Sequence, residues 1–408
     1  MKLIYIHQHF VTNEGASGTR SYDVSKHMVN AGHNIYMVTG LYDVGNFKPL
    51  PWYKLFRKEI IDGINVIFCN APYSNKFGTI RRYWAFLWFA FLATLAALTV
   101  KKPDIVFASS TPLTVGIPGY LAARLKKVPF VFEVRDIWPE SFIQSGWVTG
   151  EELSIKLMEK LEKFCYRNAQ KILLVSKGFE ESLIKRGVPR EKIRTILLGA
   201  DGSIFENIKP DYAFLDKYNL KGKKIAVFTG AHGKANGLDY VINAAEYSKH
   251  RNDIAYLLIG TGGEKEKLKD LAKSKGLTNI VFADPVSKER LVGVLAVCHI
   301  GLMILKHNPG GFRPVTPNKI FDYMFVGIPS IVNFTGPTID MIKEDNSGVF
   351  ADGTKPQELA EQVIMFVDNP AKAKQMGENG RKAALQKYDR KIIAAQLMEI
   401  FQEAIRKK

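Results

Sequence analysis

Two successive sets of short β-branched or aromatic runs, each alternating with helix-length segments, constrain the fold of this 408-residue chain most strongly. The first set comprises residues 2–7, 34–39, 64–69, 104–109, 130–134 and 171–176, and the second comprises 224–230, 254–260, 279–284, 300–305 and 330–334. This alternation is typical of βαβ units around a parallel sheet. Since the pattern restarts after the polar stretch 198–212, we predict an α/β protein with two doubly wound domains, covering residues 1–200 and 201–387.

The carboxyl ends of the predicted strands are where a ligand is expected. In open parallel sheets ligands bind outside these ends, so a chain with two such domains should place its site in a cleft between them. The last segment, RKIIAAQLMEIFQEAIRKK at 390–408, repeats apolar residues at helical spacing. We expect an amphipathic helix there, and we expect residues 388–408 to pack back on the first domain.

The charge of the chain restricts its partners. The formal net charge is +17, from 57 Lys and Arg against 40 Asp and Glu, and the first 200 residues hold 27 basic and 16 acidic residues. Such a surface favours anionic lipid, nucleic acid or phosphorylated substrates. Because no nucleic-acid-reading motif is present, we expect no nucleic-acid partner.

The cysteines and the first residues bear on the compartment. Cys69, Cys165 and Cys298 are scattered in apolar runs, which predicts buried thiols in a reducing compartment rather than disulfides or a metal site. The start MKLIYIHQHF has too short an apolar run for a signal peptide and alternates like a strand.

A Gly-containing loop, HQHFVTNEGASGTR, follows the first predicted strand and leads into a helix. Gly15 and Gly18 allow the backbone to approach a ligand closely, and free N–H groups at a helix start favour a phosphate. The alternative is that these glycines simply form the turn. Arg20 would either contact the ligand as a cation or simply be exposed to solvent.

The second domain opens with FTGAHGKANGLDYVI, which again reads as a strand, a Gly-rich turn and a helix. His232 and Lys234 stand where a cation and backbone N–H groups together could hold a diphosphate. Gly260, Gly262 and Gly263 then follow the next strand. No Walker spacing is present, so a P-loop NTPase is not expected. Gly-rich loops at three strand ends predict a nucleotide ligand.

The stretch NPGGFRPVTPNKIFDYMFVGIPSIV at 308–332 is the most specific in the chain. PNKIFDYMFVG reads as a short helix ended by Gly327, and IPSIV as the next strand. Asp322 could accept two hydroxyl hydrogen bonds from a ribose, or it could be an acid on the helix surface.

With these motifs together, the chain resembles family 4 of the retaining glycosyltransferases, which have the GT-B fold. The resemblance runs from end to end, and its segments are the first loop from Glu14 to Arg20, RDIWPES at 135–141, the Gly-rich turn that opens the second domain, and KIFDYMFVGIPSI at 319–331. The chain is most similar to the N-acetyl-L-fucosaminyltransferase-like members of O-antigen and capsule pathways. These share the RD-hydrophobic-WPE signature and the PxK-I-F-E/D-Y-M segment.

The resemblance implies two Rossmann-like domains facing a central cleft, the first binding an acceptor and the second a nucleotide sugar. It implies that Asp322 binds the ribose and that glycines of the first loop approach the donor diphosphate. Lys319, the lysine of the PxK segment, is expected among the donor-binding residues. No metal or other cofactor is expected, because cationic side chains and helix N-termini neutralise the leaving diphosphate.

The donor site departs from the family pattern in two places. The family usually has a second Glu eight positions before the ribose carboxylate, where this chain has Pro314, and we expect backbone contacts from Gly310, Gly311 and Phe312 instead. The usual Arg and Lys of the phosphate-binding pair are replaced here by Ala231 and Asn236. We therefore expect Lys234, the nearby lysine, to act on the diphosphate.

The first domain departs from the family pattern after its fifth strand, where Arg135 replaces a common His and Asp136 follows it. Asp136 and Glu140 stand one helical turn apart, so one of them could orient or deprotonate the acceptor hydroxyl, or both could be satisfied acids of a structural turn. Without a placed nucleophile, retaining transfer would be a front-side displacement in which the leaving phosphate helps to remove the acceptor proton.

The segment RRYWAFLWFAFLATLAALTVKK at 81–102 is long and apolar enough to cross a bilayer, since a helix over 83–100 would measure about 27 Å. Predicted strands of one sheet lie on both sides of it in the sequence, so a helix of the first domain is the better interpretation. It lacks a polar face, however, and Trp84 and Trp88 follow Arg81 and Arg82. This pattern is typical of a monotopic membrane contact, with burial or an oligomer interface as the alternatives.

The sequence thus favours a metal-independent, retaining glycosyltransferase. It would move a sugar, expected to be an N-acetylated amino or deoxyamino sugar, from a UDP-sugar to a lipid-linked or glycan acceptor in surface polysaccharide synthesis. The expected location is the cytoplasmic face of the inner membrane, in peripheral contact with anionic lipid. Two other interpretations stay open: a UDP-N-acetylglucosamine 2-epimerase-like enzyme of the same fold, and a non-catalytic nucleotide-sugar-binding scaffold.

Overall fold

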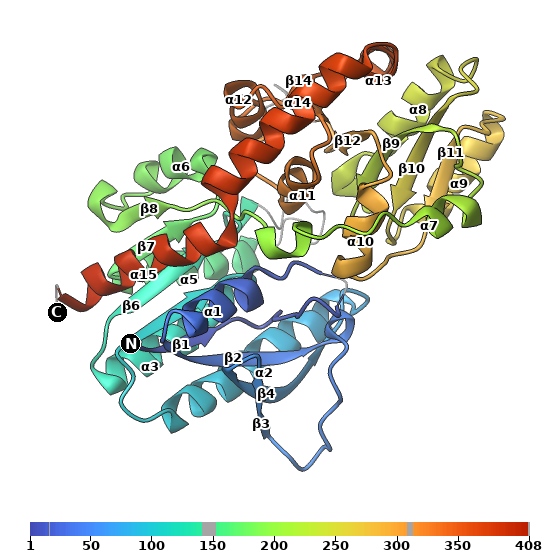
Figure 1. Cartoon of the computed structure of the whole chain (residues 1–408). Helices are drawn as coiled ribbons and strands as arrows, with labels where there is room; N and C mark the ends of the chain where they lie inside the picture. Colours follow the sequence, from blue (N-terminus) through green and yellow to red (C-terminus); the bar gives the residue numbers. More distant parts are fainter. Residues whose placement is uncertain (16, 141–151, 308–312, 407–408) are drawn as a thin grey trace. The chain divides into compact units, whose positions relative to one another are not determined.

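Two mixed α/β units make up the chain, which was analysed as a computed structural model that describes residues 1–15, 17–140, 152–307 and 313–406. The first unit comprises Met1–Leu197 together with Arg390–Lys408, and the second comprises Leu198–Asp389 (Figure 1). Each unit is built around one sheet, which helices cover on both faces.

The first unit contains an eight-stranded sheet in the order β3-β4-β2-β1-β5-β6-β7-β8. Its strands are β1 (Lys2–Ile6), β2 (Asn34–Tyr42), β3 (Phe56–Ile61), β4 (Ile64–Tyr73), β5 (Ile105–Ser109), β6 (Phe130–Val134), β7 (Lys171–Leu174) and β8 (Ile193–Thr195). Its helices are α1 (Arg20–Asn30), α2 (Thr79–Thr99), α3 (Gly116–Lys126), α5 (Glu152–Asn168), α6 (Glu180–Lys185) and α15 (Arg390–Arg406). All strand pairs are parallel except β3 with β4.

The second unit contains a six-stranded parallel sheet in the order β11-β10-β9-β12-β13-β14. Its strands are β9 (Lys224–Thr229), β10 (Ile254–Ile259), β11 (Ile280–Ala283), β12 (Ile300–Met303), β13 (Ser330–Val332) and β14 (Gly348–Phe350). Its helices are α7 (Tyr212–Lys217), α8 (Asp239–Tyr247), α9 (Lys265–Ser274), α10 (Lys288–Leu295), α11 (Asn318–Val326), α12 (Pro337–Glu344), α13 (Pro356–Asp368) and α14 (Pro370–Ala383). Chain order reverses between β9 and β12, which is where such sheets bind ligands.

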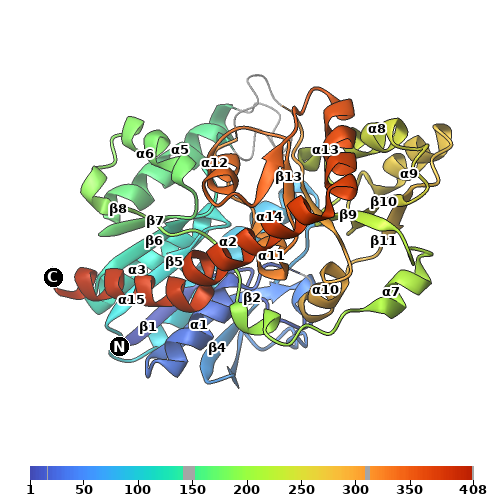
Figure 2. The same ribbon diagram turned by 45° about the horizontal axis from the view of Figure 1, so that its top comes forward.

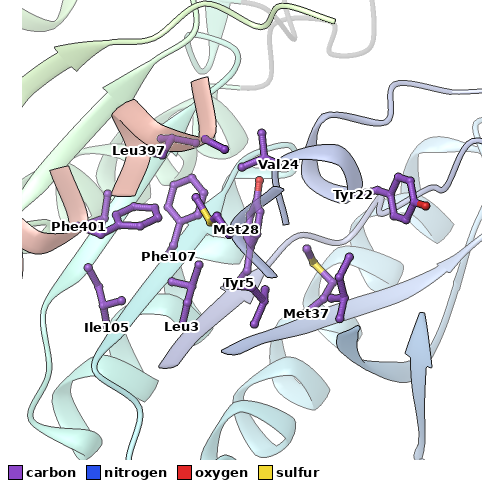
Figure 3. Packing of buried hydrophobic residues seen from close by; sticks show 14 of the residues in the cluster. Leu3, Tyr5, Tyr22, Val24, Met28, Met37, Ile105, Phe107, Leu397 and Phe401 are labelled. Carbon is purple, nitrogen blue, oxygen red and sulfur yellow. The ribbon is translucent and has the colours of Figure 1, made fainter. Parts of the chain in front are cut away.

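The last helix, α15, belongs to the first unit although it follows the whole second unit in the sequence. Both views show it running beside α1 (Figures 1 and 2). Its apolar face joins a core with β1 and β5, where the rings of Phe401 and Phe107 lie 5.1 Å apart beside buried Leu3 and Leu397 (Figure 3). The first unit therefore needs the C-terminal helix to complete its core.

Eleven of the strands in the two sheets match the predicted runs, whereas β3, β8 and β14 were not predicted. β3 is an antiparallel edge strand with the sequence FRKEII, whose central residues are exposed. Because it has no buried stripe of its own, its sequence lacks the apolar pattern by which the others were found. β8 and β14 are only three residues long.

Helix α2 covers the sheet of the first unit and packs against α3 and β4. It is the one helix of the described residues that is long and apolar enough to cross a membrane, by length and composition alone. Since β4 and β5, on either side of α2 in the sequence, belong to one sheet, α2 is a covering helix of that sheet. The three cysteines are free and buried, as predicted.

Candidate functional site

The loops after β9 and β10 pack against each other at the carboxyl edge of the second sheet. A Cβ atom on Gly260 would lie 1.8 Å from the Gly230 carbonyl oxygen, and one on Gly262 would lie 2.5 Å from that of His232. The backbone N–H of His232 donates to Thr261, at 2.9 Å. Two of the glycines that predicted a ligand loop are therefore required for loop packing, and contact of Gly262 with a donor stays a prediction.

Lys319 lies at the same edge, in the first turn of α11. Its Nζ lies 3.6 Å from the centroid of the Phe228 ring and would lie 3.3 Å from a Cβ on Gly230. Burial lowers its pKa to about 7, and no carboxylate of the described residues contributes to that shift. An ammonium without a counter-ion at a strand end is ready to bind an anion.

His232 is buried next to this lysine, and neither ring nitrogen has a hydrogen-bond partner among the described residues. Burial lowers its pKa to about 4, with further lowering from Lys265, Lys319 and Lys269. The imidazole is therefore neutral at physiological pH. Its ring nitrogens offer a hydrogen-bond donor and an acceptor beside Lys319 without adding charge.

Lys234, in contrast, is exposed in the short turn Lys234–Asn236. The side chain of Asn236 donates to the carbonyl oxygen of Ala231 at 2.7 Å and closes this turn. The two residues that replace the family's phosphate-binding pair thus bond to each other.

Asp322 is buried on α11, where its carboxylate pairs with the Nζ of Lys288 from α10 at 2.5 Å. The side chains are 8% and 13% exposed respectively, so the interpretation of Asp322 as an acid on the helix surface is wrong. Lys288 was not singled out from the sequence, although it follows a strand end, as a site residue should. Gly310, Gly311 and Phe312, the residues expected to contact the donor sugar, lie outside the described residues.

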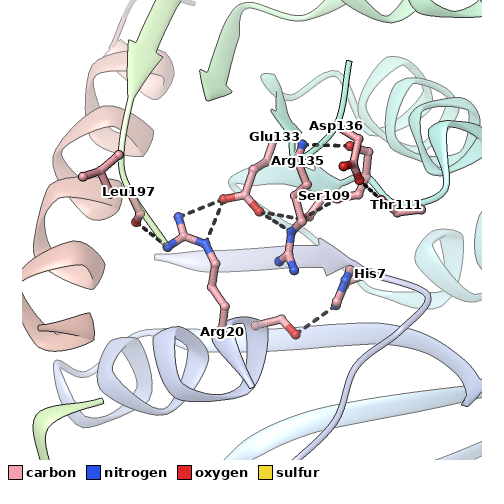
Figure 4. Close-up of polar contacts among 10 residues, drawn as sticks. His7, Arg20, Ser109, Thr111, Glu133, Arg135, Asp136 and Leu197 are labelled. Atoms are coloured by element: carbon pink, nitrogen blue, oxygen red, sulfur yellow. Dashed lines mark hydrogen bonds and ion pairs between the residues drawn. The ribbon is translucent and has the colours of Figure 1, made fainter. Parts of the chain in front are cut away.

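In the first unit, a buried ionic network joins α1 to the ends of β5 and β6 (Figure 4). Glu133 accepts from Arg20 through one carboxylate oxygen, at 2.9 Å, and from Arg135 and Ser109 through the other, at 3.0 and 2.5 Å. Arg20 also donates to the carbonyl oxygen of Leu197, at 2.8 Å. Burial alone would raise the pKa of Glu133, but Arg20 and Arg135 outweigh it and lower the pKa to about 2.

Arg20 is 2% exposed, so the alternative of a solvated Arg20 is wrong. Its guanidinium bridges α1 and β6, and its contact with a donor stays a prediction. Gly15 is tightly packed, since a Cβ there would lie 2.3 Å from Val11, whereas Gly18 is exposed. Arg135 is 18% exposed, and its Nη2 is buried without a partner among the described residues.

The two acids that follow β6 have different surroundings. Asp136 accepts a hydrogen bond from the Thr111 hydroxyl at 2.6 Å, and burial raises its pKa (Figure 4). Glu140 is 48% exposed and pairs with Arg186, which also binds the buried Glu162 at 2.5 Å. Asp136 is thus a buried carboxylate bonded to one hydroxyl, and Glu140 belongs to an ion-pair network.

His9 was not singled out from the sequence. It follows β1, and its ring lies 4.5 Å from that of Tyr73 and 5.0 Å from that of Tyr42. Burial and then the charge of Arg135 lower its pKa to about 3. Gln8 beside it is fully buried, with neither amide atom bonded within the described residues. The signal available in the sequence was the polar run HQH directly after a strand.

Helix α2 buries one apolar face and exposes several other large apolar residues. Phe86, Phe89 and Leu92 are buried among the alanines 90, 93, 96 and 97. Trp84, Leu87, Trp88 and Phe91 are 69%, 51%, 44% and 54% exposed. The Trp88 indole donates to the carbonyl oxygen of Asn70, whose side chain donates to Pro51 and Lys54.

The loop that Asn70 holds extends this apolar surface. Trp52, Tyr53 and Leu55 are 89%, 64% and 43% exposed. At the start of α2, Arg81 lies over the Phe77 ring at 3.8 Å, and Arg82 donates to the carbonyl oxygens of Asn75 and Phe77. Residues 44–102 contain nine Lys and Arg but only two acids.

Two α/β units, whose sheets are parallel apart from the β3–β4 pair and carry polar residues at the strand ends, have the architecture of the GT-B fold. Residues 15–199 match the family model described as glycosyl transferase 4-like domain, and residues 213–383 match that of glycosyl transferases group 1. The first unit therefore matches a glycosyl transferase 4-like domain and the second a glycosyl transferases group 1 domain, which agrees with the coarser part of the resemblance.

Individual relatives are distant. The chain is 23% identical over 261 residues to the probable glycosyltransferase WbjE of Pseudomonas aeruginosa, which covers 63% of this chain and 64% of WbjE. It is 24% identical to the putative colanic acid biosynthesis glycosyl transferase WcaI of Escherichia coli, over 57% of each chain. Both matches thus span less than two thirds of the relative.

Among solved structures, Anabaena HepE in complex with UDP superposes with a TM-score of 0.70 at 17% identity, covering 99% of this chain and 100% of that one. At this identity the likeness establishes the fold.

Proposed function

We propose that this protein is a retaining, metal-independent glycosyltransferase that moves an N-acetylated amino or deoxyamino sugar from a UDP-sugar to a lipid-linked saccharide. The observation that supports a UDP-sugar donor is the kind of side chain found at the carboxyl edge of the second sheet. A buried carboxylate, Asp322, and a half-buried ammonium without an anionic partner among the described residues, Lys319, lie three positions apart on α11, and these groups suit a ribose and a diphosphate. The UDP complex of HepE supports uracil as the base of the donor.

The reaction we propose is a front-side displacement. The acceptor hydroxyl oxygen bonds to the anomeric carbon on the face from which the phosphate oxygen departs, so the configuration is retained. The hydroxyl proton passes to the departing phosphate oxygen, and UDP leaves. Asp136 suits the task of orienting the acceptor hydroxyl better than Glu140 does, because Glu140 is paired with Arg186, whereas Asp136 has no arginine pair among the described residues.

The acceptor half rests on the exposed aromatic surface of α2 and the loop of Trp52. Aromatic rings beside an excess of basic residues suit the interface of an anionic membrane. A polyprenyl-diphosphate-linked saccharide would reach the first unit there, at the cytoplasmic face of the inner membrane. The name of WcaI, a putative colanic acid biosynthesis glycosyl transferase, supports the proposed role in surface polysaccharide synthesis.

The experiment is incubation with a panel of UDP-sugars, with and without a polyprenyl-diphosphate-linked saccharide, followed by NMR of the anomeric proton in the product. We expect UDP release and a retained anomeric configuration only when the acceptor is present. Epimerised UDP-sugar without acceptor would indicate the 2-epimerase instead. Binding of UDP-sugar with no turnover across the panel would indicate the scaffold, and loss of activity in EDTA would contradict metal independence.

A further inference from the structure

Three lysines lie near the carboxyl edge of the second sheet, and they differ in whether their ammonium groups have hydrogen-bond or ion-pair partners within the protein. The Nζ of Lys265 donates to the carbonyl oxygens of Gly260 and Ala283 and to the carboxylate of Asp284, at 2.8 to 3.2 Å. Lys288 is paired with Asp322. Lys265 thus has three acceptors within the protein and Lys288 has a carboxylate partner, so both ammonium groups are already engaged.

Lys319 has no such partner. Within the described residues its Nζ makes neither an ion pair nor a hydrogen bond, and the five residues from 308 to 312 contain no acid. The Phe228 ring beneath it holds the ammonium by a cation–π contact, which supplies far less than the lost hydration. The side chain is half-buried, so its ammonium has lost part of its hydration without gaining an anionic partner among the described residues, and this position favours a ligand that supplies one.

The place of Lys319 suits an anion. It stands in the first turn of α11, where free backbone N–H groups and the helix dipole attract negative charge. α11 follows β12, and β9 and β12 are the strands between which the chain order reverses. On the other side of the amine, Gly230 leaves open the space that a Cβ would fill, at 3.3 Å.

We propose that Lys319, rather than the exposed Lys234, is the cation that binds the diphosphate of the donor and neutralises the charge that develops on the leaving group. This inference rests on the proposed function. As the bond from the anomeric carbon to the phosphate oxygen breaks, the negative charge on UDP increases, and an ammonium fixed against Phe228 stabilises that charge without reorganising. Lys319 is on this view a catalytic residue that touches the donor.

A proton-linked affinity follows from the same position. Lys319 lowers the pKa of His232 from the β9 loop, and that imidazole is neutral. Lys265 and Lys269 from α9 act on the same imidazole and are paired with Asp284 and Glu266, and Asp322, three positions further along α11, is paired with Lys288. None of them supplies a free negative charge. An arriving diphosphate therefore raises the pKa of Lys319 from about 7, and at pH 8 donor binding takes up a proton.

The test compares UDP and uridine binding to the purified protein by calorimetry at pH 8. For Lys319→Gln we expect UDP affinity to fall by at least about 10-fold while uridine affinity is unchanged. Lys319→Arg, which keeps a cation, should retain UDP affinity. Lys221→Gln removes one exposed charge of the same unit and serves as the matched control, with no change expected.

Calorimetry in HEPES and in Tris measures proton uptake, because the two buffers have different heats of ionisation and the observed binding heat then differs in proportion to the protons taken up. We expect the wild type to take up protons on binding UDP at pH 8 and Lys319→Arg to take up none. Wild-type UDP affinity in Lys319→Gln, or a larger loss in Lys234→Gln than in Lys319→Gln, would overturn the inference and leave the proposed function intact. A wild type that binds neither uridine nor UDP would instead refute the proposed donor.

Discussion

The guanidinium of Arg20 lies 2.9 Å from the carboxylate of Glu133, and the two side chains are 2% and 1% exposed. The pair joins α1 to β6 inside the first unit. Arg135 pairs with the other carboxylate oxygen of Glu133. A carboxylate shared by two arginines away from water must stay ionised, because protonation would leave two buried cations unpaired.

Replacing Glu133 with Gln should therefore destabilise the first unit strongly. We expect a loss of about 3–5 kcal/mol in the free energy of unfolding, since one partner of a buried ion pair is removed and two guanidinium groups remain. Urea denaturation followed by tryptophan fluorescence measures this. Glu181→Gln, which breaks an exposed pair with Lys185, is the control, and equal stability of the two variants would contradict the prediction.

Acid should weaken the fold through the same carboxylate. The pKa of Glu133 is about 2 in the folded state, below its ordinary value near 4.5, so its stabilising contribution is complete above pH 4.5 and is lost as pH falls toward 2. Urea midpoints measured between pH 5 and pH 3 should fall more steeply in the wild type than in Glu133→Gln. Parallel slopes would show that Glu133 does not carry the acid sensitivity.

Replacing Lys319 with Met should stabilise the ligand-free protein while weakening UDP binding. Methionine keeps the contact with Phe228 and removes a desolvated charge. We expect a rise in Tm of a few degrees without UDP, and a smaller UDP-induced rise in Tm than in the wild type. A lower Tm in the absence of UDP would mean that Lys319 has a structural partner.

Exposed aromatic residues of α2 should anchor the protein to lipid. Trp84 and Trp88 replaced together by Ser should reduce flotation with anionic liposomes at least several-fold, because both indoles leave the interface. Tyr212→Ser with Tyr247→Ser, at exposed sites of the second unit, is the matched control and should float like the wild type.

Liposome composition separates the contribution of the aromatic side chains to lipid binding from that of the basic side chains. Neutral liposomes should bind less protein than anionic ones, because the basic residues of 44–102 then lose their partner. A wild type that floats with neither composition, or a double variant that floats as the wild type does, would reject the membrane contact. In that case a concentration-dependent dimer in the wild type alone would assign the surface to a second copy of the chain.

Residue patterns predicted the fold well because they depend on local periodicity. The parallel strands KLIYI and IAYLLI are buried on both faces, so each forms a continuous apolar run that is visible without any partner. FRKEII is paired only along one edge and carries exposed charges, and nothing local separates it from a loop. Its existence depends on β4, which follows it by a tight turn.

Side-chain partners could be predicted less well, because they depend on residues far apart in the sequence. Glu133 stands out as a charge within FVFEV, yet its partner Arg20 lies 113 positions earlier. Similarly, Asp322 was recognised from its segment, whereas Lys288 comes from a different helix. Nothing in the sequence separates Lys234 from Lys319, and only the structure shows that the first is exposed and the second is half-buried against Phe228.

Helix α15 gives the first unit an unusual dependence during synthesis. Its core partners Leu3 and Phe107 are made early, but 192 residues, Leu198–Asp389, are translated before α15. At about 5–20 residues per second, the sheet waits on the order of 10 to 40 s for its last helix. The second unit has time to fold first, and throughout that interval the nascent first sheet presents an uncovered apolar face to the cell's chaperones.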